Sequence, residues 1–143
     1  MTDKKVIFEK VDPDAKIPEK QHTCDIGYDI YASEDTEIEQ GEVKMVPTGL
    51  KMSLPRKVEA QIRPRSGLSL SGLEIMNSPG TIDPGFRGEV QVIMANVLGD
   101  DFTIDKGDRI AQMVFNRVEH PTIEEGDVDE SERGECGFGS TGI

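Results

Sequence analysis

The chain has 143 residues, a hydrophobic content of 35% without any tryptophan, and a formal net charge of −12. This length is typical of one domain, and the negative charge argues against nonspecific binding to nucleic acid, whose phosphates require basic surfaces. There is no run of about eighteen apolar residues that would span a membrane. There is no visible export signal either, so we expect a cytoplasmic protein.

The cysteines and histidines do not predict a metal site or a disulfide. Cys24 and Cys136 lie far apart and neither belongs to a CxxC pair, so we expect free thiols in a reducing compartment. The chain has only two histidines, His22 and His120, which argues against zinc.

Alternation of apolar and polar residues predicts short β-strands along most of the chain. The nearly continuous apolar run at 109–115 is typical of a strand covered on both faces. Residues 66–74 leave room for one short helical turn at most. Turn residues recur about every ten positions, which favours a sandwich or jelly roll. The predicted strands cover residues 6–11, 43–52 with a break at Pro47-Thr-Gly49, 58–63, 89–95 and 109–115.

Residues 77–89 contain three glycines and two prolines, which predicts a surface hairpin bounded by turns. Its exposed backbone groups, together with the carboxylate of Asp83 and the ring of Phe86, would suit recognition of a small planar ligand. The simpler alternative is an ordinary hairpin in which Asp83 caps a turn.

The C-terminal part changes in character. Seven of the fourteen residues 119–132 are acidic, which predicts an extended, solvated connector. The glycine-rich tail that follows could bring backbone amides and the hydroxyls of Ser140 and Thr141 to phosphates, with Phe138 stacking on a base. A disordered tail is the alternative. The tail is not a Walker A loop, since no Gly-Lys-Ser/Thr follows.

Five segments stand out along the chain: Asp25–Tyr31, Arg63–Leu68, 77–89, Lys106–Gln112 and the tail from Arg133. Together, in this order, they resemble the five motifs of the homotrimeric dUTPase family (deoxyuridine 5′-triphosphate nucleotidohydrolases). The resemblance covers about residues 24–142. The departures are Ile26 for a small residue, Phe86 for the more frequent tyrosine and Cys136 for glycine, and none removes a group that the chemistry requires.

The resemblance implies an all-β, distorted jelly roll (β-clip, dUTPase-like) with an extended C-terminal arm. Residues 1–118 would form the jelly-roll domain, and residues 119–143 the acidic connector and arm of the same domain. The implied assembly is a homotrimer in which each arm closes on a neighbouring subunit's site. Neither nucleic acid nor a membrane is an expected partner.

The implied reaction is hydrolysis of dUTP to dUMP and pyrophosphate by water attack on the α-phosphate, with Mg²⁺ on the triphosphate. This would limit uracil in DNA and supply dUMP. Asp83 would be the general base, and Asp29 would anchor magnesium through water. The implied substrate contacts are Asn77, Gly80, Thr81 and Ile82 for uracil, Phe86 for deoxyribose, Arg65, Ser66, Gly67 and Gln112 for the phosphates, Phe138 stacking over uracil, and Arg133, Gly139, Ser140 and Thr141 closing on the phosphates.

Two alternatives stay open at this point. A dCTP deaminase, or a bifunctional deaminase–dUTPase, shares the β-fold. A non-catalytic, dUTP-sensing regulatory trimer on the same scaffold belongs to a different class.

Overall fold

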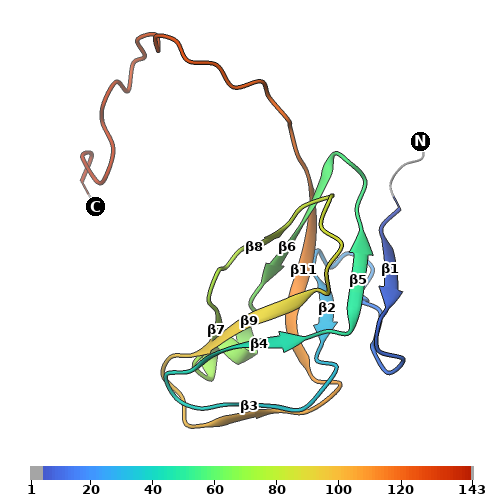
Figure 1. Cartoon of the computed structure of the whole chain (residues 1–143). Coiled ribbons are helices and arrows are strands. Elements are labelled where there is room, and N and C mark those ends of the chain that lie inside the picture. Colours follow the sequence, from blue (N-terminus) through green and yellow to red (C-terminus); the bar gives the residue numbers. More distant parts are fainter. Residues whose placement is uncertain (1–4, 143) are drawn as a thin grey trace.

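The computed structural model describes residues 5–142 and consists almost entirely of β-structure (Figure 1). It confirms the all-β prediction, and α1 (Ser66–Leu70) is the one short helix of this range. Residues 1–4 and 143, which belong to the predicted segments 1–118 and 119–143, lie outside the described residues. The strands are β1 (Ile7–Lys10), β2 (Tyr28–Tyr31), β3 (Thr36–Ile38), β4 (Val43–Pro47), β5 (Leu50–Ser53), β6 (Val58–Arg63), β7 (Leu73–Ile75), β8 (Gly80–Ile82), β9 (Gln91–Asn96), β10 (Phe102–Ile104) and β11 (Arg109–Arg117).

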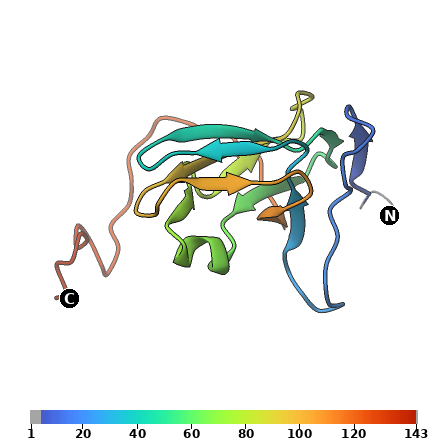
Figure 2. The ribbon, with the colours of Figure 1, turned by 90° about the horizontal axis from the view of Figure 1, so that it is seen from below.

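The strands form two larger sheets and two ribbons. One sheet has the order β2-β11-β6-β8 and the other the order β4-β9-β7, while β1 pairs with β5 and β10 with β3. All of these pairs are antiparallel. Figure 2 shows α1 outside the stacked strands, below them in that view. As α1 is only five residues long, it is far too short to cross a membrane.

Each of the predicted strands is present, with small shifts at the ends. The break predicted at Pro47-Thr-Gly49 separates β4 from β5. Strand β9 begins at Gln91, two residues later than expected. Four further strands, β2, β3, β7 and β10, were not predicted; three of them have only three residues, too few for alternation to be recognised.

The hydrophobic core lies between the sheets and follows the predicted alternation. On β6, Ala60 and Ile62 are buried, and Val92 and Met94 face the same core from β9. Along β11, both faces are covered as far as Val114, as its continuous apolar run predicted.

A tight corner between β4 and β5 fixes the chain just after the 77–89 stretch. Gly49 has a φ of +71°, and a Cβ there would lie 2.9 Å from the Cβ atoms of Ala15 and Asp12, so only glycine fits. The Thr48 hydroxyl donates to the Val90 carbonyl at 2.6 Å, and the Gly49 amide donates to the Glu89 carboxylate at 2.9 Å. These bonds hold residues 89 and 90 against the second sheet.

The predicted hairpin at residues 77–89 is not formed. Strand β8 pairs with β6, and the chain then crosses to the other sheet, which it enters as β9. Within the described residues, the one backbone hydrogen bond between the two halves of this stretch runs from Phe86 N to Asp83 O. The prediction was wrong because the partner of β8 is distant in the sequence, where local turn residues give no information about it.

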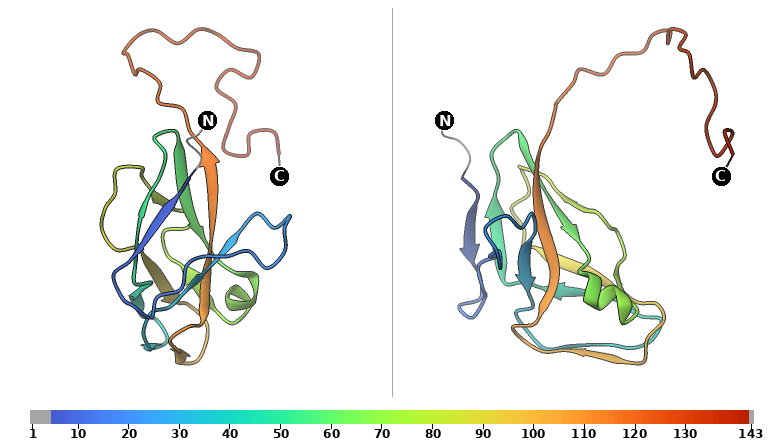
Figure 3. Two further views of the ribbon diagram at one scale, coloured as in Figure 1. Left: turned by 90° about the vertical axis from the view of Figure 1, so that its right-hand side faces the viewer. Right: turned by 180° about the vertical axis from the view of Figure 1, so that it is seen from behind.

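After β11 the chain leaves the body as a long exposed arm (Figures 1 and 3). Val118 N still donates to Lys57 O, and the His120 ring contacts Arg56 O at 2.9 Å. Farther along, up to residue 142, the arm's hydrogen bonds are internal. The predicted boundary at residue 118 stays a prediction.

Asn96 offers a test of how the second sheet is held to the β3 region. Its side chain is buried; it donates to Ile38 O and Asp100 O and accepts from Gly99 N. Replacing it with alanine leaves buried groups without partners, so Asn96→Ala should lower the free energy of unfolding by about 2–3 kcal/mol. Urea denaturation at fixed protein concentration measures this.

The matched control is Asn116→Ala on β11, where the side chain is half-buried and has no hydrogen bond among the described residues. A change of about 0.5 kcal/mol or less is expected there. Equal losses in the two variants would contradict the role assigned to Asn96.

Candidate active site

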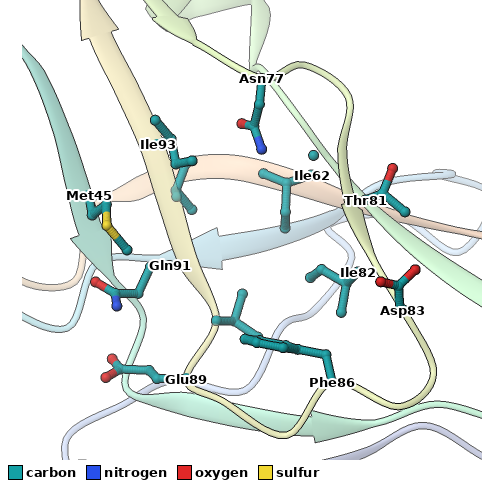
Figure 4. Close-up of a pocket in the computed structure, with 13 residues that line it drawn as sticks. Met45, Ile62, Asn77, Thr81, Ile82, Asp83, Phe86, Glu89, Gln91 and Ile93 are labelled. Atoms are coloured by element: carbon teal, nitrogen blue, oxygen red, sulfur yellow. The ribbon is translucent and has the colours of Figure 1, made fainter.

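A pocket of about 220 Å³ opens between β8 of one sheet and β4 and β9 of the other (Figure 4). In that view Asn77 and Phe86 lie at opposite ends, with Ile62 between them. The pocket thus collects those residues of the body that are predicted to bind uracil and deoxyribose, together with the predicted general base, but not Phe138 of the arm. Those residues are Asn77, Gly80, Thr81, Ile82, Asp83 and Phe86.

Strand β8 presents a free backbone edge at this pocket. It is the outermost strand of its sheet and pairs only through its β6 side within the described chain. A Cβ at Gly80 would lie 3.2 Å from Asn77 Nδ2, so the Asn77 amide sits directly over the β8 backbone. Backbone N–H and C=O groups and a side-chain amide are therefore available in one small area.

The loop between β8 and β9 carries Phe86 and holds its ring close to the backbone. A Cβ at Gly88 would lie 2.7 Å from Phe86 Cζ, so glycine is what lets the ring pack there. Arg87 Nη1 donates to Pro84 O at 2.6 Å and to Phe86 O at 3.1 Å. Phe86 itself is 45% exposed, so it forms a wall of the pocket rather than part of the core.

Asp83 follows β8 directly and is exposed at the edge of the pocket. None of the ion pairs in the described part of the chain involves its carboxylate. A carboxylate without such a partner can accept a hydrogen bond from a water molecule.

A second cluster forms around Asp29 on β2, which is only 9% exposed. Gln21 Nε2 donates to its Oδ2 at 2.8 Å. Arg65 Nε lies 3.5 Å from Oδ1 and Arg109 Nη1 lies 3.8 Å from Oδ2, and Arg65 Nη1 also donates to Arg109 O at 3.3 Å. Two guanidinium groups thus share one buried carboxylate.

Gln112 belongs to the same region and is held by close packing. It lies opposite Asp29 in the β11–β2 register, and its Nε2 donates to Pro64 O at 3.0 Å. A Cβ atom at Gly27 would overlap with the Oε1 atom of Gln112. Glycine at position 27 is therefore required for this placement of the amide.

Tyr31 lies opposite Arg109 and is part of the electrostatic surroundings of this cluster. Burial raises the pKa of the Tyr31 phenol, and the negative charges of Glu19 and Asp29 raise it further, while Arg109 lowers it. The phenol therefore stays neutral at physiological pH and adds no negative charge beside the arginines.

Ser66 and Gly67 begin α1, next to Arg65, and both are exposed. A Cβ at Gly67 would meet no atom within 4 Å, so the space above it is open. The predicted phosphate-side residues of the body are thus neighbours, with Ser66 and Gly67 exposed and Arg65 and Gln112 half-buried.

The two clusters are separate within one chain. The register pairs Ile82 with Ala60, which puts Asp83 level with Glu59, whereas Gln112 is level with Arg63. At about 3.3 Å per residue these two levels are about 13 Å apart along β6, and Arg65 lies farther on.

The predicted arm residues are not brought to either cluster. None of them lines the pocket, and Figure 1 shows the arm ending away from the body. Phe138 is fully exposed with a φ of +52°, and Arg133 Nε donates to Cys136 O at 2.7 Å. The predicted roles of Arg133, Phe138, Gly139, Ser140 and Thr141 stay predictions.

The sequence did not predict the residues that form the wall of the pocket opposite β8. Alternation in the β9 segment already put Gln91 and Ile93 on one face, but it gave no sign that this face meets β8. The added lining residues are Met45, Ile62, Glu89, Val90, Gln91, Val92 and Ile93.

Within residues 5–142 no three His, Cys, Asp or Glu side chains gather to hold a metal ion. Both oxygens of Asp29, the predicted water-mediated ligand, already face the donors of Gln21, Arg65 and Arg109. Because Mg²⁺ keeps several waters and binds readily to phosphate oxygens, these residues fit an ion carried by a triphosphate better than one held by a protein cage.

Comparisons with known proteins point to one family. A dUTPase family model matches residues 13–142. The chain is 46% identical over 145 residues to the deoxyuridine 5′-triphosphate nucleotidohydrolase of Solibacter usitatus (strain Ellin6076), with 99% of each chain covered. These matches span nearly the whole sequence.

Among solved structures, a variant of the Staphylococcus bacteriophage 80alpha dUTPase with dUpNHpp superimposes with a TM-score of 0.90 at 28% identity, covering 97% of this chain and 99% of that chain. A variant dUTPase from phage phi11 of S. aureus, described as coordinating a structural Mg(II) ion, gives 0.81 at 22% identity, covering 87% and 97%. At that lower identity the likeness shows the fold alone. The first match confirms the predicted jelly-roll class.

The contact between Gly27 and Gln112 can be tested directly. A methyl group at position 27 would displace the Gln112 amide from Pro64 O, so Gly27→Ala should lower the free energy of unfolding by about 1 kcal/mol. It should also shift the Gln112 side-chain amide signals in an NMR spectrum.

Gly85→Ala is the control, because a Cβ there meets nothing within 4 Å. Its stability should stay within about 0.5 kcal/mol of the parent. Unchanged Gln112 signals in Gly27→Ala would show that the placement of the amide is wrong.

Proposed function

The chain belongs to the dUTPase family, and on this premise we propose that it hydrolyses dUTP to dUMP and pyrophosphate by attack of water on the α-phosphate. The reaction would limit uracil in DNA and supply dUMP. The observation that carries the proposal is the pocket in which the free edge of β8 and the Asn77 amide lie beside Asp83. Groups suited to selecting a base and to activating water are thus neighbours.

Uracil selection follows from the polarity of the groups at this pocket. A free strand edge offers alternating N–H and C=O groups, which can match the donor and acceptors of uracil and would be mismatched to cytosine. Close packing of the backbone around Gly80 would exclude the methyl group of thymine. The Phe86 ring would pack on deoxyribose and leave no room for a 2′-hydroxyl.

Asp83 is the proposed general base. A carboxylate is a weak base, so its position must contribute more than its basicity. Its exposed place directly after β8 supports this role, since the attacking water would lie between the bound base and the phosphates.

The phosphates would be held by Arg65, Ser66, Gly67 and Gln112. Arg65 supplies a planar, permanently charged group that suits phosphate oxygens, and Ser66 and Gly67 supply a hydroxyl and accessible backbone. Mg²⁺ would enter the site bound to the triphosphate of the substrate, where it would neutralise part of the phosphate charge. For Asp29, the contacts with Arg65 and Arg109 support an electrostatic role, and its water-mediated contact with magnesium stays a prediction.

The separation of the two clusters supports a site shared between copies of the chain. One nucleotide must contact Asp83 and the phosphate-binding residues together, yet these levels are about 13 Å apart along β6 and Arg65 lies beyond. A second copy that places its Arg65 cluster beside the first copy's pocket would complete the site. We propose the homotrimer on this basis, because rotational symmetry then completes every site equally.

The arm would close the site from a neighbouring subunit. Residues 119–132 can span about 45 Å when extended, enough to leave one subunit and reach another. Phe138 would then stack over uracil, and Arg133, Gly139, Ser140 and Thr141 would contact the phosphates. Closure of this kind excludes water and strengthens every charge contact inside. The cytoplasmic location stays a prediction from the sequence.

Replacing the proposed base gives the most direct test. Asp83→Asn keeps the shape but cannot accept a proton, so kcat for dUTP should fall by about 10²–10⁴-fold while binding of dUMP changes little. Pyrophosphate release from dUTP, dCTP and dTTP measures activity and selectivity. Asp127→Asn, an exposed change in the connector, is the control and should leave kcat unaltered.

The same assay separates the alternatives. Ammonia released from dCTP would indicate a deaminase, and tight dUTP binding without turnover by the parent chain would indicate a regulatory sensor. Equal turnover by Asp83→Asn and the parent would remove Asp83 from the mechanism.

Mixed assemblies test the shared site. Asp83→Asn and Arg65→Ala copies are each expected to be nearly inactive alone. Co-refolded in equal amounts, they should recover about a quarter of parental activity, because that fraction of sites pairs an intact Asp83 with an intact Arg65 from another copy. If each site lay within one chain, mixing would restore nothing.

A further inference from the structure

Arg109, the first residue of β11, has no role in the reaction as described so far. Its side chain is 45% exposed, and its guanidinium lies 3.8 Å from Asp29 Oδ2. Its backbone carbonyl accepts a hydrogen bond from Arg65 Nη1 at 3.3 Å. Arg109 therefore contacts both members of the Arg65–Asp29 ion pair.

We propose that Arg109 is a positioning residue for phosphate binding, which keeps Arg65 available to the substrate by sharing the charge of Asp29. This inference rests on the proposed function and names a residue that the predicted substrate contacts do not include. Arg109 itself need not touch the nucleotide.

The charge of Asp29 is the origin of this effect. Its side chain is only 12% exposed, so water screens its charge poorly and it attracts any nearby cation strongly. If Arg65 were its sole charged partner, the pair would be neutral and the carboxylate would compete with the triphosphate for Arg65. With Arg109 present, two positive charges face the Asp29 carboxylate, so Asp29 neutralises less of the Arg65 charge and Arg65 can attract a polyanion. Glu19 lies 3.4 Å from the Tyr31 hydroxyl and forms no ion pair with either arginine within the described chain.

The geometry divides the carboxylate between the two arginines. Arg65 faces Oδ1 and Arg109 faces Oδ2, so the two cations do not compete for one oxygen. Gln21 also donates to Oδ2 but is neutral and cannot replace the charge of Arg109. The bond from Arg65 to the Arg109 carbonyl involves the backbone, so a change of the Arg109 side chain removes the charge and leaves this contact.

Direct binding in magnesium-free buffer isolates the charge effect. For Arg109→Gln we expect the Kd of dUpNHpp to rise about tenfold and the Kd of dUMP to change less than about threefold, because the lost attraction scales with phosphate charge. Arg109→Lys keeps the charge and should restore most of the affinity. In turnover assays with dUTP, Arg109→Gln should raise KM more than it lowers kcat.

Arg117→Gln is the matched control, since Arg117 ends the same strand, is exposed and makes no ion pair within the described chain. It removes the same charge far from Asp29 and should change the Kd of dUpNHpp less than about twofold. If the two variants changed the Kd of dUpNHpp equally, only the net charge of the protein would matter, and the inference would be overturned.

The double variant gives the sharpest test. When Asp29→Asn is added to Arg109→Gln, the competing carboxylate disappears, so the double variant should bind dUpNHpp more tightly than Arg109→Gln alone. If Asp29 and Arg109 were merely structural, the double variant would bind no better or worse, and the proposal would be wrong. Thermal melting of each variant verifies folding.

Failure of this inference is distinct from failure of the proposed function. A parent chain that does not hydrolyse dUTP would refute the function. A parent chain that hydrolyses dUTP, with a double variant no better than Arg109→Gln, would refute only the role of Arg109.

Discussion

Strand β8 hydrogen-bonds to β6 along one edge, and the chain then leaves for the other sheet, so the second edge of β8 faces a pocket instead of a partner strand. The rest of the site depends on this separation of β8 from the strand that follows it in the chain. The return segment is kept away from β8 by the Thr48 and Gly49 corner, which binds residues 89 and 90 to the second sheet. Together with the pairing of Gln91 and Pro47 in the β4–β9 ladder, these bonds keep the return segment from pairing with β8.

Charge is organised locally in a protein whose overall charge is strongly negative. A net charge of −12 repels a triphosphate at long range, and salt and bound cations weaken that repulsion. Near Asp29, two arginines share a single buried carboxylate, so positive charge is gathered there in spite of the negative total. The acidic connector adds to the total charge but lies outside the body, where solvent screens it.

The sequence predicted what depends on local pattern and failed where distant segments meet. Alternation located β6 and the break between β4 and β5, and the apolar run located β11 with both faces covered. The hairpin was wrong because β8 pairs with a strand some twenty residues earlier, yet the expected free backbone groups are present for this very reason. Asn77, Asp83 and Phe86, which motif resemblance grouped, line one pocket in the structure. The resemblance could not supply Gln91 on the opposite wall, nor the Arg109 ion pair, since both depend on pairing between strands.

The distance between the Asp83 and Arg65 levels also has a consequence for regulation by concentration. If the site is shared between copies as proposed, a lone chain would hold half of one site and half of another, and a newly made or dissociated chain would be catalytically silent toward nucleotides. Specific activity would then fall on dilution below the assembly constant, even though each chain remained folded. Assembly itself would then activate the enzyme. Any agent that separates the subunits would inhibit it without occupying its pocket.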